Sequence, residues 1–128
     1  MHEKEIEIRW RDLDPYGHVN NAVYLTYLEE VRDEWLDRAL GDAGGAWDYV
    51  IARVEIDFRR ELTQADGRLV ARCVLDSLGT SSVRTREELV TGAGELAAEA
   101  HAVLVARDPG TRRSRPLTDD ERAALERA

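Results

Sequence analysis

Residues 12–24 read DLDPYGHVNNAVY and join a turn to the start of a helix. The turn chemistry lies in Asp14–Gly17, because proline fixes φ and glycine adopts positive φ without steric cost. Asn20 or Asn21 can cap the helix that follows. Two carboxylates, an imidazole, two amides and two phenols therefore fall close together beside a helix N-terminus. Such a grouping can supply a base or nucleophile next to donors for a developing negative charge.

A helix is predicted from about Asn21 to Leu40, and Gly41 is placed to end it. Apolar side chains recur there at helical spacing, with charged residues on the opposite side. The apolar stripe consists of Tyr24, Tyr27, Leu28, Val31, Trp35, Leu36 and Leu40.

Alternation of apolar and polar residues predicts strands on both sides of this helix. One spans residues 3–10, with Ile6, Ile8 and Trp10 on its buried face. Four more follow the helix, the first with Val50, Ala52, Val54, Ile56 and Phe58 on one face. Asp66–Gly67 is a hairpin signal after that strand, so antiparallel pairing is expected among the last four strands. Thr118 and Glu121 form a capping box that opens a short C-terminal helix.

Composition limits the class of protein. A chain of 128 residues fits one domain, 1–128, and its net charge of −8 argues against nucleic acid as a partner. The single cysteine, Cys73, excludes a disulfide or a thiolate zinc site within the chain, and we expect it to be buried in a strand. The first residues carry no secretory signal and no apolar run is long enough to cross a membrane, so a soluble, cytoplasmic chain is expected.

No metal or cofactor is expected. His2, His18 and His101 are scattered without the spacing of metal ligands, and no glycine-rich loop suited to phosphate is present. His101 alternates with an alanine-rich strand face and is expected on the strand surface.

The order of one strand, a long helix and four strands resembles the hotdog fold, an α+β fold in which an antiparallel sheet wraps a central helix. The motif D-x-D-P-x-G-H-V-N-N-x-x-Y, residues 12–24, resembles the 4-hydroxybenzoyl-CoA thioesterase-like family of acyl-CoA thioesterases. Its DLD and HVNN parts are also similar to plant acyl-carrier-protein thioesterases of the same fold. The resemblance covers essentially the whole chain. It implies hydrolysis of an acyl-CoA or acyl-carrier-protein thioester by a homodimer or homotetramer, with sites between subunits and a neighbour's residues near 54–60 lining the acyl pocket.

The resemblance also assigns roles. Asp14, directly before the proline, corresponds to the catalytic carboxylate, which acts as a nucleophile or as a general base. The backbone N–H of Asn21 would polarise the thioester carbonyl. His18 would orient substrate or transfer protons, or would serve only as a turn residue. Asp12 is expected to be structural. Glu29 is a reserve candidate, since some hotdog thioesterases carry the carboxylate on the central helix.

Substrate contacts are less clearly specified. Tyr24 is a candidate, although its place on the apolar stripe favours core packing with a satisfied hydroxyl. In aromatic-CoA thioesterases basic residues near the turn before the third strand of the sheet meet the nucleotide. Here that stretch, residues 78–82, ends in Ser82 and contains no basic residue. The remaining candidates for phosphate contacts are Arg59, Arg60, Arg84, Arg112 and Arg113.

Two other functions remain open at this point. A hotdog hydratase or dehydratase would pair Asp12 or Asp14 with His18 for proton transfer to carbon. A non-catalytic acyl-binding module would use the fold without the chemistry.

Overall fold

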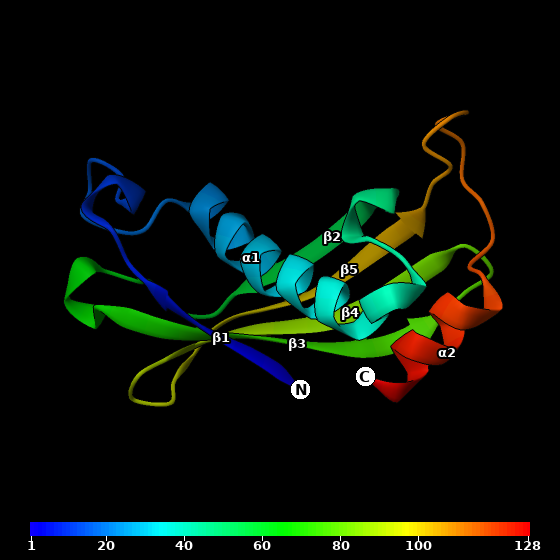
Figure 1. Ribbon diagram of the computed structural model, residues 1–128. Helices are drawn as coiled ribbons and strands as arrows, with labels where there is room; N and C mark the ends of the chain where they lie inside the picture. Colours follow the sequence, from blue (N-terminus) through cyan, green and yellow to red (C-terminus); the bar gives the residue numbers. More distant parts are fainter.

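The computed structural model describes all residues, 1–128. A five-stranded antiparallel sheet in the order β1-β3-β4-β5-β2 curves around one long helix, α1 (Figure 1). The hotdog architecture expected from the sequence is confirmed. The elements are β1 (His2–Glu7), α1 (Asn21–Leu40), β2 (Tyr49–Phe58), β3 (Arg68–Leu78), β4 (Ser82–Thr91), β5 (Leu96–Ala106) and α2 (Asp119–Arg127).

Helix α1 has the predicted bounds and the predicted buried stripe. The Asn20 side chain accepts a 2.8 Å hydrogen bond from the backbone N–H of Ala22, which caps the first turn. Gly41, at φ 53°, ends the helix. The stripe packs mainly on β1, β3 and β4, and there it meets the inner-face residues Leu69, Ala71 and Cys73, all at most 1% exposed. The expected burial of Cys73 is confirmed.

The predicted pairing of β2 with β3 is wrong. Strand β2 pairs with β5 at one edge of the sheet, whereas β3 lies between β1 and β4. The chain from 59 to 67 therefore crosses the end of the sheet from the edge strand β2, past β5 and β4, to β3. Gln64–Asp66 form a 3-10 turn closed by Gly67 at φ 67° rather than a hairpin. Asp66–Gly67 marks a local turn correctly, but a local signal does not specify which strands pair.

The first strand is shorter than predicted, and Trp10 does not lie on its buried face. Ile6 and Ile8 are buried as expected, but β1 ends at Glu7. A 3-10 turn follows over Trp10–Asp12, because the Asp12 carboxylate accepts a hydrogen bond from the backbone N–H of Arg9 (3.0 Å). The turn leaves the Trp10 side chain 78% exposed.

A β-bulge changes the faces of β2. The register with β5 shifts between Ile51 and Arg53. Ile51, rather than Val50, therefore shares the inner face with Ile56 and Phe58. Ile51 and Phe58 are nevertheless 48% and 46% exposed, because α1 does not cover this edge of the sheet.

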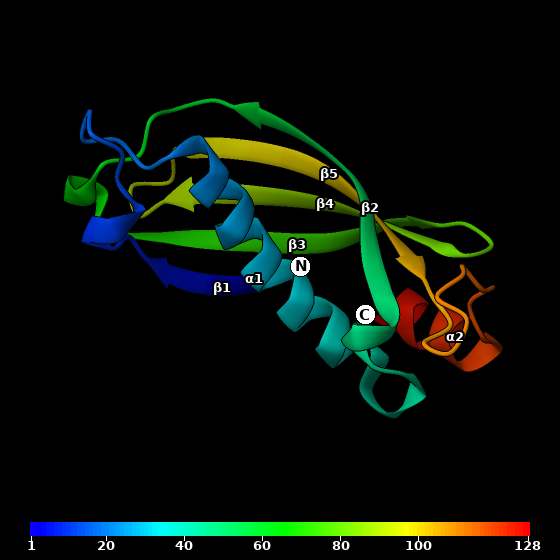
Figure 2. The ribbon, with the colours of Figure 1, turned by 90° about the horizontal axis from the view of Figure 1, so that it is seen from above.

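The C-terminal helix α2 begins at the predicted capping box of Thr118 and Glu121 and lies beside the C-terminal end of α1 (Figure 2). The Glu121 carboxylate is 1% exposed and accepts hydrogen bonds from the Tyr49 hydroxyl (2.5 Å) and from the Arg115 guanidinium (2.7 Å). No helix of the structure has the length and apolar character needed to span a bilayer.

Candidate active site

The candidate site is the turn between β1 and α1, at one end of the molecule (Figures 1 and 2). Asp14 Oδ1 accepts hydrogen bonds from the backbone N–H groups of Tyr16 (2.9 Å) and His18 (3.2 Å). The Asp14 N–H donates to the His18 carbonyl (2.7 Å), and Gly17, at φ 85°, completes the turn. The other carboxylate oxygen, Oδ2, makes no hydrogen bond within the chain. One oxygen of Asp14 therefore holds the turn and the other is available for chemistry.

Asp12 is buried and structural, as expected. Its Oδ2 accepts a 2.6 Å hydrogen bond from the Tyr27 hydroxyl, and its Oδ1 lies 3.1 Å from the Arg9 guanidinium. Burial favours the protonated acid, but the hydrogen bonds from Tyr27 and Arg9 outweigh it and lower the pKa of Asp12. Asp12 is thus a charged anchor that ties the turn to α1.

The first turn of α1 presents an unused donor. The Asn20 side chain binds the N–H of Ala22, and the Asn20 carbonyl accepts from Val23 (2.8 Å). The backbone N–H of Asn21 makes no hydrogen bond within the chain. It lies at the positive end of the helix dipole, where an oxyanion is stabilised.

His18 is held by its backbone and paired through its ring. Its backbone forms an antiparallel bridge with Thr63, and its Nε2 lies 3.2 Å from Oε2 of Glu61. Both side chains are partly exposed. Glu61 was not predicted as a site residue, because no local motif indicates that the 59–67 connection returns to this turn.

Tyr24 is 3% exposed, and its hydroxyl is fully used within the chain. The hydroxyl donates to the Arg60 carbonyl and accepts from the Leu62 N–H, both at 2.9 Å. Its ring meets Phe58 edge-on at 5.1 Å between centroids. This geometry supports the packing role: Tyr24 fixes the chain after β2 against α1.

The candidate arginines differ in position and pairing. Arg59 pairs with Glu99 (2.6 Å), and Arg60 pairs with Asp66 and Glu95 (3.1 and 2.8 Å). Arg84 is exposed on the outer face of β4 without an ion pair.

Ser82 lies at the opposite end of the sheet, in the turn where its carbonyl accepts from the Gly79 N–H (2.9 Å). Within one chain the structure therefore groups Asp14, His18 and Asn21, with Tyr24, Arg59 and Arg60 on adjoining segments. Ser82 and Arg84 are not brought to them.

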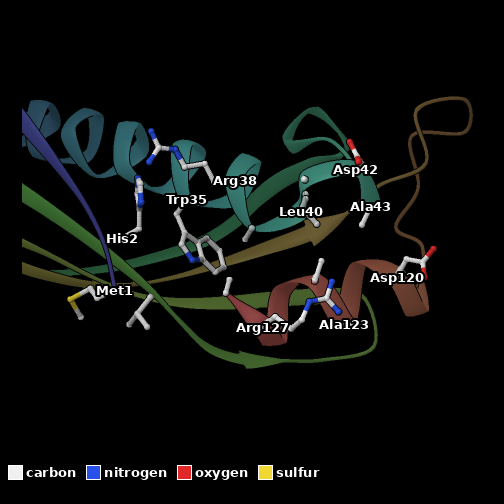
Figure 3. Close-up of a pocket in the computed structure, with 15 residues that line it drawn as sticks. Met1, His2, Trp35, Arg38, Leu40, Asp42, Ala43, Asp120, Ala123 and Arg127 are labelled. Carbon is white, nitrogen blue, oxygen red and sulfur yellow. The ribbon is translucent and has the colours of Figure 1, made fainter.

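Two hollows lie away from Asp14. A cleft of about 610 Å³ between α1 and β2 is lined by Glu29, Asp33 and Ile51, among others. Burial, followed by the neighbouring Glu29 charge, raises the pKa of Asp33 there. A hollow of about 830 Å³ lies between the end of α1 and α2, with Trp35 pointing into it (Figure 3). No group of three or more His, Cys, Asp or Glu residues is placed to hold a metal ion.

The chain matches known proteins over nearly its whole length. Residues 8–125 match the model of the thioesterase-like superfamily. The long-chain acyl-CoA thioesterase FadM of Escherichia coli K12 is 27% identical over 130 residues, covering 97% of this chain and 96% of FadM. A thioesterase of Thermus thermophilus, solved in complex with coenzyme A and Zn, is 32% identical to this chain. The match covers 98% of this chain and 92% of the Thermus chain, and the two structures superimpose with a TM-score of 0.88. The chloroplastic acyl-acyl carrier protein thioesterase ATL2 of Arabidopsis thaliana is 46% identical over 37 residues, 29% of this chain and 20% of ATL2.

The fold and the turn before its central helix define a hotdog-fold thioester hydrolase. The chain belongs to the thioesterase-like superfamily.

Proposed function

We infer that the chain hydrolyses an acyl-CoA thioester to a free acid and a thiol, with Asp14 as the reacting carboxylate. The observation that carries this proposal is the pair of unused groups in one short turn, Asp14 Oδ2 and the Asn21 N–H. Thioester hydrolysis requires a nucleophile or base and a donor for the oxyanion that attack on the carbonyl creates, and a carboxylate beside a helix N-terminus can supply both. The similarity to FadM and to the coenzyme A complex from Thermus supports an acyl-CoA substrate.

Two routes fit the same geometry. As a nucleophile, Asp14 Oδ2 attacks the carbonyl carbon, the C–S bond breaks, the thiolate leaves and takes up a proton, and water hydrolyses the mixed anhydride. As a general base, Asp14 takes a proton from water, which attacks in its place. In both routes the Asn21 N–H donates to the carbonyl oxygen as charge develops there. His18, paired with Glu61, would orient substrate or transfer protons.

We also propose that the working protein is a homodimer or homotetramer. Strand β2 is an edge strand whose inner face leaves Ile51 and Phe58 about half exposed. Pairing with a second copy would bury these side chains and close the cleft beside α1. The acyl pocket would then form from both subunits, since neither hollow of a single chain includes Asp14.

A free-thiol release assay with short, medium, long and aromatic acyl-CoAs, and with an acyl-carrier-protein thioester, tests the function. Thiol release from at least one acyl-CoA is expected. Loss of the ultraviolet absorbance of a 2-enoyl-CoA without thiol would instead identify a hydratase. Thermal stabilisation by an acyl-CoA without turnover would identify a binding module.

A further inference from the structure

Arg11 is an unpaired cation beside the candidate catalytic turn. It is exposed and makes no hydrogen bond or ion pair. Its neighbour Arg9 is bound to Asp12, and Arg60, across the turn, is bound to Asp66 and Glu95. Arg11 is therefore the guanidinium at this end of the molecule that is available to an anion.

Two aromatic side chains in the same hydrogen-bonded segment as Arg11, residues 10–17, are exposed. Trp10 is 78% exposed and Tyr16 is 84% exposed. The backbone between them is fixed by hydrogen bonds from the Leu13 N–H to the Trp10 carbonyl (3.2 Å) and from the Asn20 N–H to the Asp12 carbonyl (2.9 Å). Tyrosine and tryptophan are enriched at binding surfaces, because each joins a large apolar ring to a polar group.

The other unpaired arginines lie elsewhere. Arg84 is on the outer face of the sheet. Arg112 and Arg113 are in the loop after β5, at the end of the molecule opposite the 10–17 segment (Figures 1 and 2). Within one chain, Arg11 is therefore the unpaired cation near Asp14 that is available to contact the phosphates of a nucleotide.

We propose that Arg11, with Trp10 and Tyr16, binds the phosphorylated nucleotide of a coenzyme A thioester. A planar guanidinium is suited to phosphate, and indole and phenol faces stack on a purine. Two residues separate Arg11 from Asp14, and the three Cα–Cα steps between them span at most about 11 Å. The pantetheine arm can bridge this distance between phosphate and thioester. The proposal rests on the proposed function, and it makes these residues determinants of specificity for CoA over simpler thiols.

Binding is tested first, since it needs no turnover. Calorimetric titration with adenosine 3′,5′-bisphosphate, the nucleotide fragment of CoA, is expected to show binding that Arg11→Ala weakens at least about tenfold. Arg127→Ala is the matched control, because Arg127 is also exposed and unpaired but lies in the last turn of α2; it should bind like the wild type. Trp10→Ala should weaken binding, and Trp10→Phe should retain most of it.

Kinetics supply the second readout. Arg11→Ala should raise KM for an acyl-CoA about tenfold with little change in kcat, and should leave hydrolysis of the N-acetylcysteamine thioester of the same acid unchanged. Equal effects on both substrates would overturn the proposal while leaving the hydrolase intact.

Equal bisphosphate binding by wild type and Arg11→Ala, or no binding by the wild type, would also overturn the proposal. So would conversion of an oligomer to a monomer by Arg11→Ala or Trp10→Ala, which would assign the surface to subunit contact. If the wild type hydrolyses none of the thioesters, the proposed function is contradicted instead. The bisphosphate titration would still test whether the nucleotide binds at Arg11.

Discussion

The Tyr27 hydroxyl donates a 2.6 Å hydrogen bond to Asp12 Oδ2, and both side chains are buried. This bond joins the N-terminal part of the apolar stripe of α1 to the turn that presents Asp14. Burial, followed by the bond to Asp12, raises the pKa of Tyr27, so the phenol remains the donor and Asp12 the charged acceptor. The core of the fold thereby fixes the position of the candidate catalytic carboxylate.

Tyr27→Phe should lower the free energy of unfolding by about 2 kcal/mol, because it removes one hydrogen bond to a buried charge. Urea denaturation measures this loss. Tyr16→Phe is the control: its ring is 84% exposed and its hydroxyl makes no bond within the chain, so it should change stability by less than about 0.5 kcal/mol. Equal stability of the two variants would show that the Asp12 bond does not anchor the turn.

Glu121 should make stability depend on pH in an acidic window. Burial opposes its charge, but the hydrogen bonds from Arg115, Tyr49 and Thr118 prevail and lower its pKa from 4.5 to about 2. A depressed carboxyl pKa stabilises the fold above pH 4.5, and this contribution, about 3 kcal/mol, is lost as pH falls toward 2. Thermal unfolding from pH 5 to pH 2 should show a steeper loss for the wild type than for Glu121→Gln. Parallel curves would contradict the assignment.

Removing one partner of the buried ion pair between Arg32 and Glu87 should lower the free energy of unfolding far more than replacing both partners. Arg32 Nε and an Nη bind the two Glu87 oxygens at 2.8 and 2.9 Å, and both residues are at most 5% exposed. Glu87→Leu should destabilise the chain by about 3–5 kcal/mol, because it leaves a buried guanidinium unpaired. The double variant Arg32→Met/Glu87→Leu should recover most of that loss in chemical denaturation. A double variant as unstable as the single one would show that the ion pair itself is the source of stability.

The exposed inner face of β2 should control assembly. Light scattering of the wild type is expected to give the mass of a dimer or tetramer. Ile51→Glu should shift the assembly toward monomer, because the added charge would be buried at the subunit contact. Thr26→Glu, an exposed change on α1, is a control for added charge. A wild-type monomer would contradict the assembly.

The helix and the turn could be predicted from the sequence because their signals are local. Asn20 caps α1, Gly41 ends it, and the turn residues of Asp14–Gly17 adopt the expected conformation. The partner of β2 and the face of Ile51 could not be predicted in this way. Pairing depends on contacts distant in sequence, and a bulge reverses the faces of a strand without altering the period of the residues beyond it.

The same distinction applies to the site. Asp14, His18 and Asn21 fall in one motif and stay together in the fold. Glu61 reaches His18 only because the chain from 59 to 67 crosses the end of the sheet and bridges Thr63 to His18. Ser82, which the resemblance placed near the nucleotide, begins β4 at the end of the sheet opposite this turn.

The most direct test of the central claim is the rate of thiol release by Asp14→Asn. Asparagine Oδ1 can still accept the hydrogen bonds from Tyr16 and His18, so the turn should persist and thermal unfolding should match the wild type. With the fold intact, kcat should fall at least about a hundredfold on the best acyl-CoA, because the amide is neither a nucleophile nor a base. Turnover within a few-fold of the wild type would contradict the account and move the chemistry to His18 or Glu29.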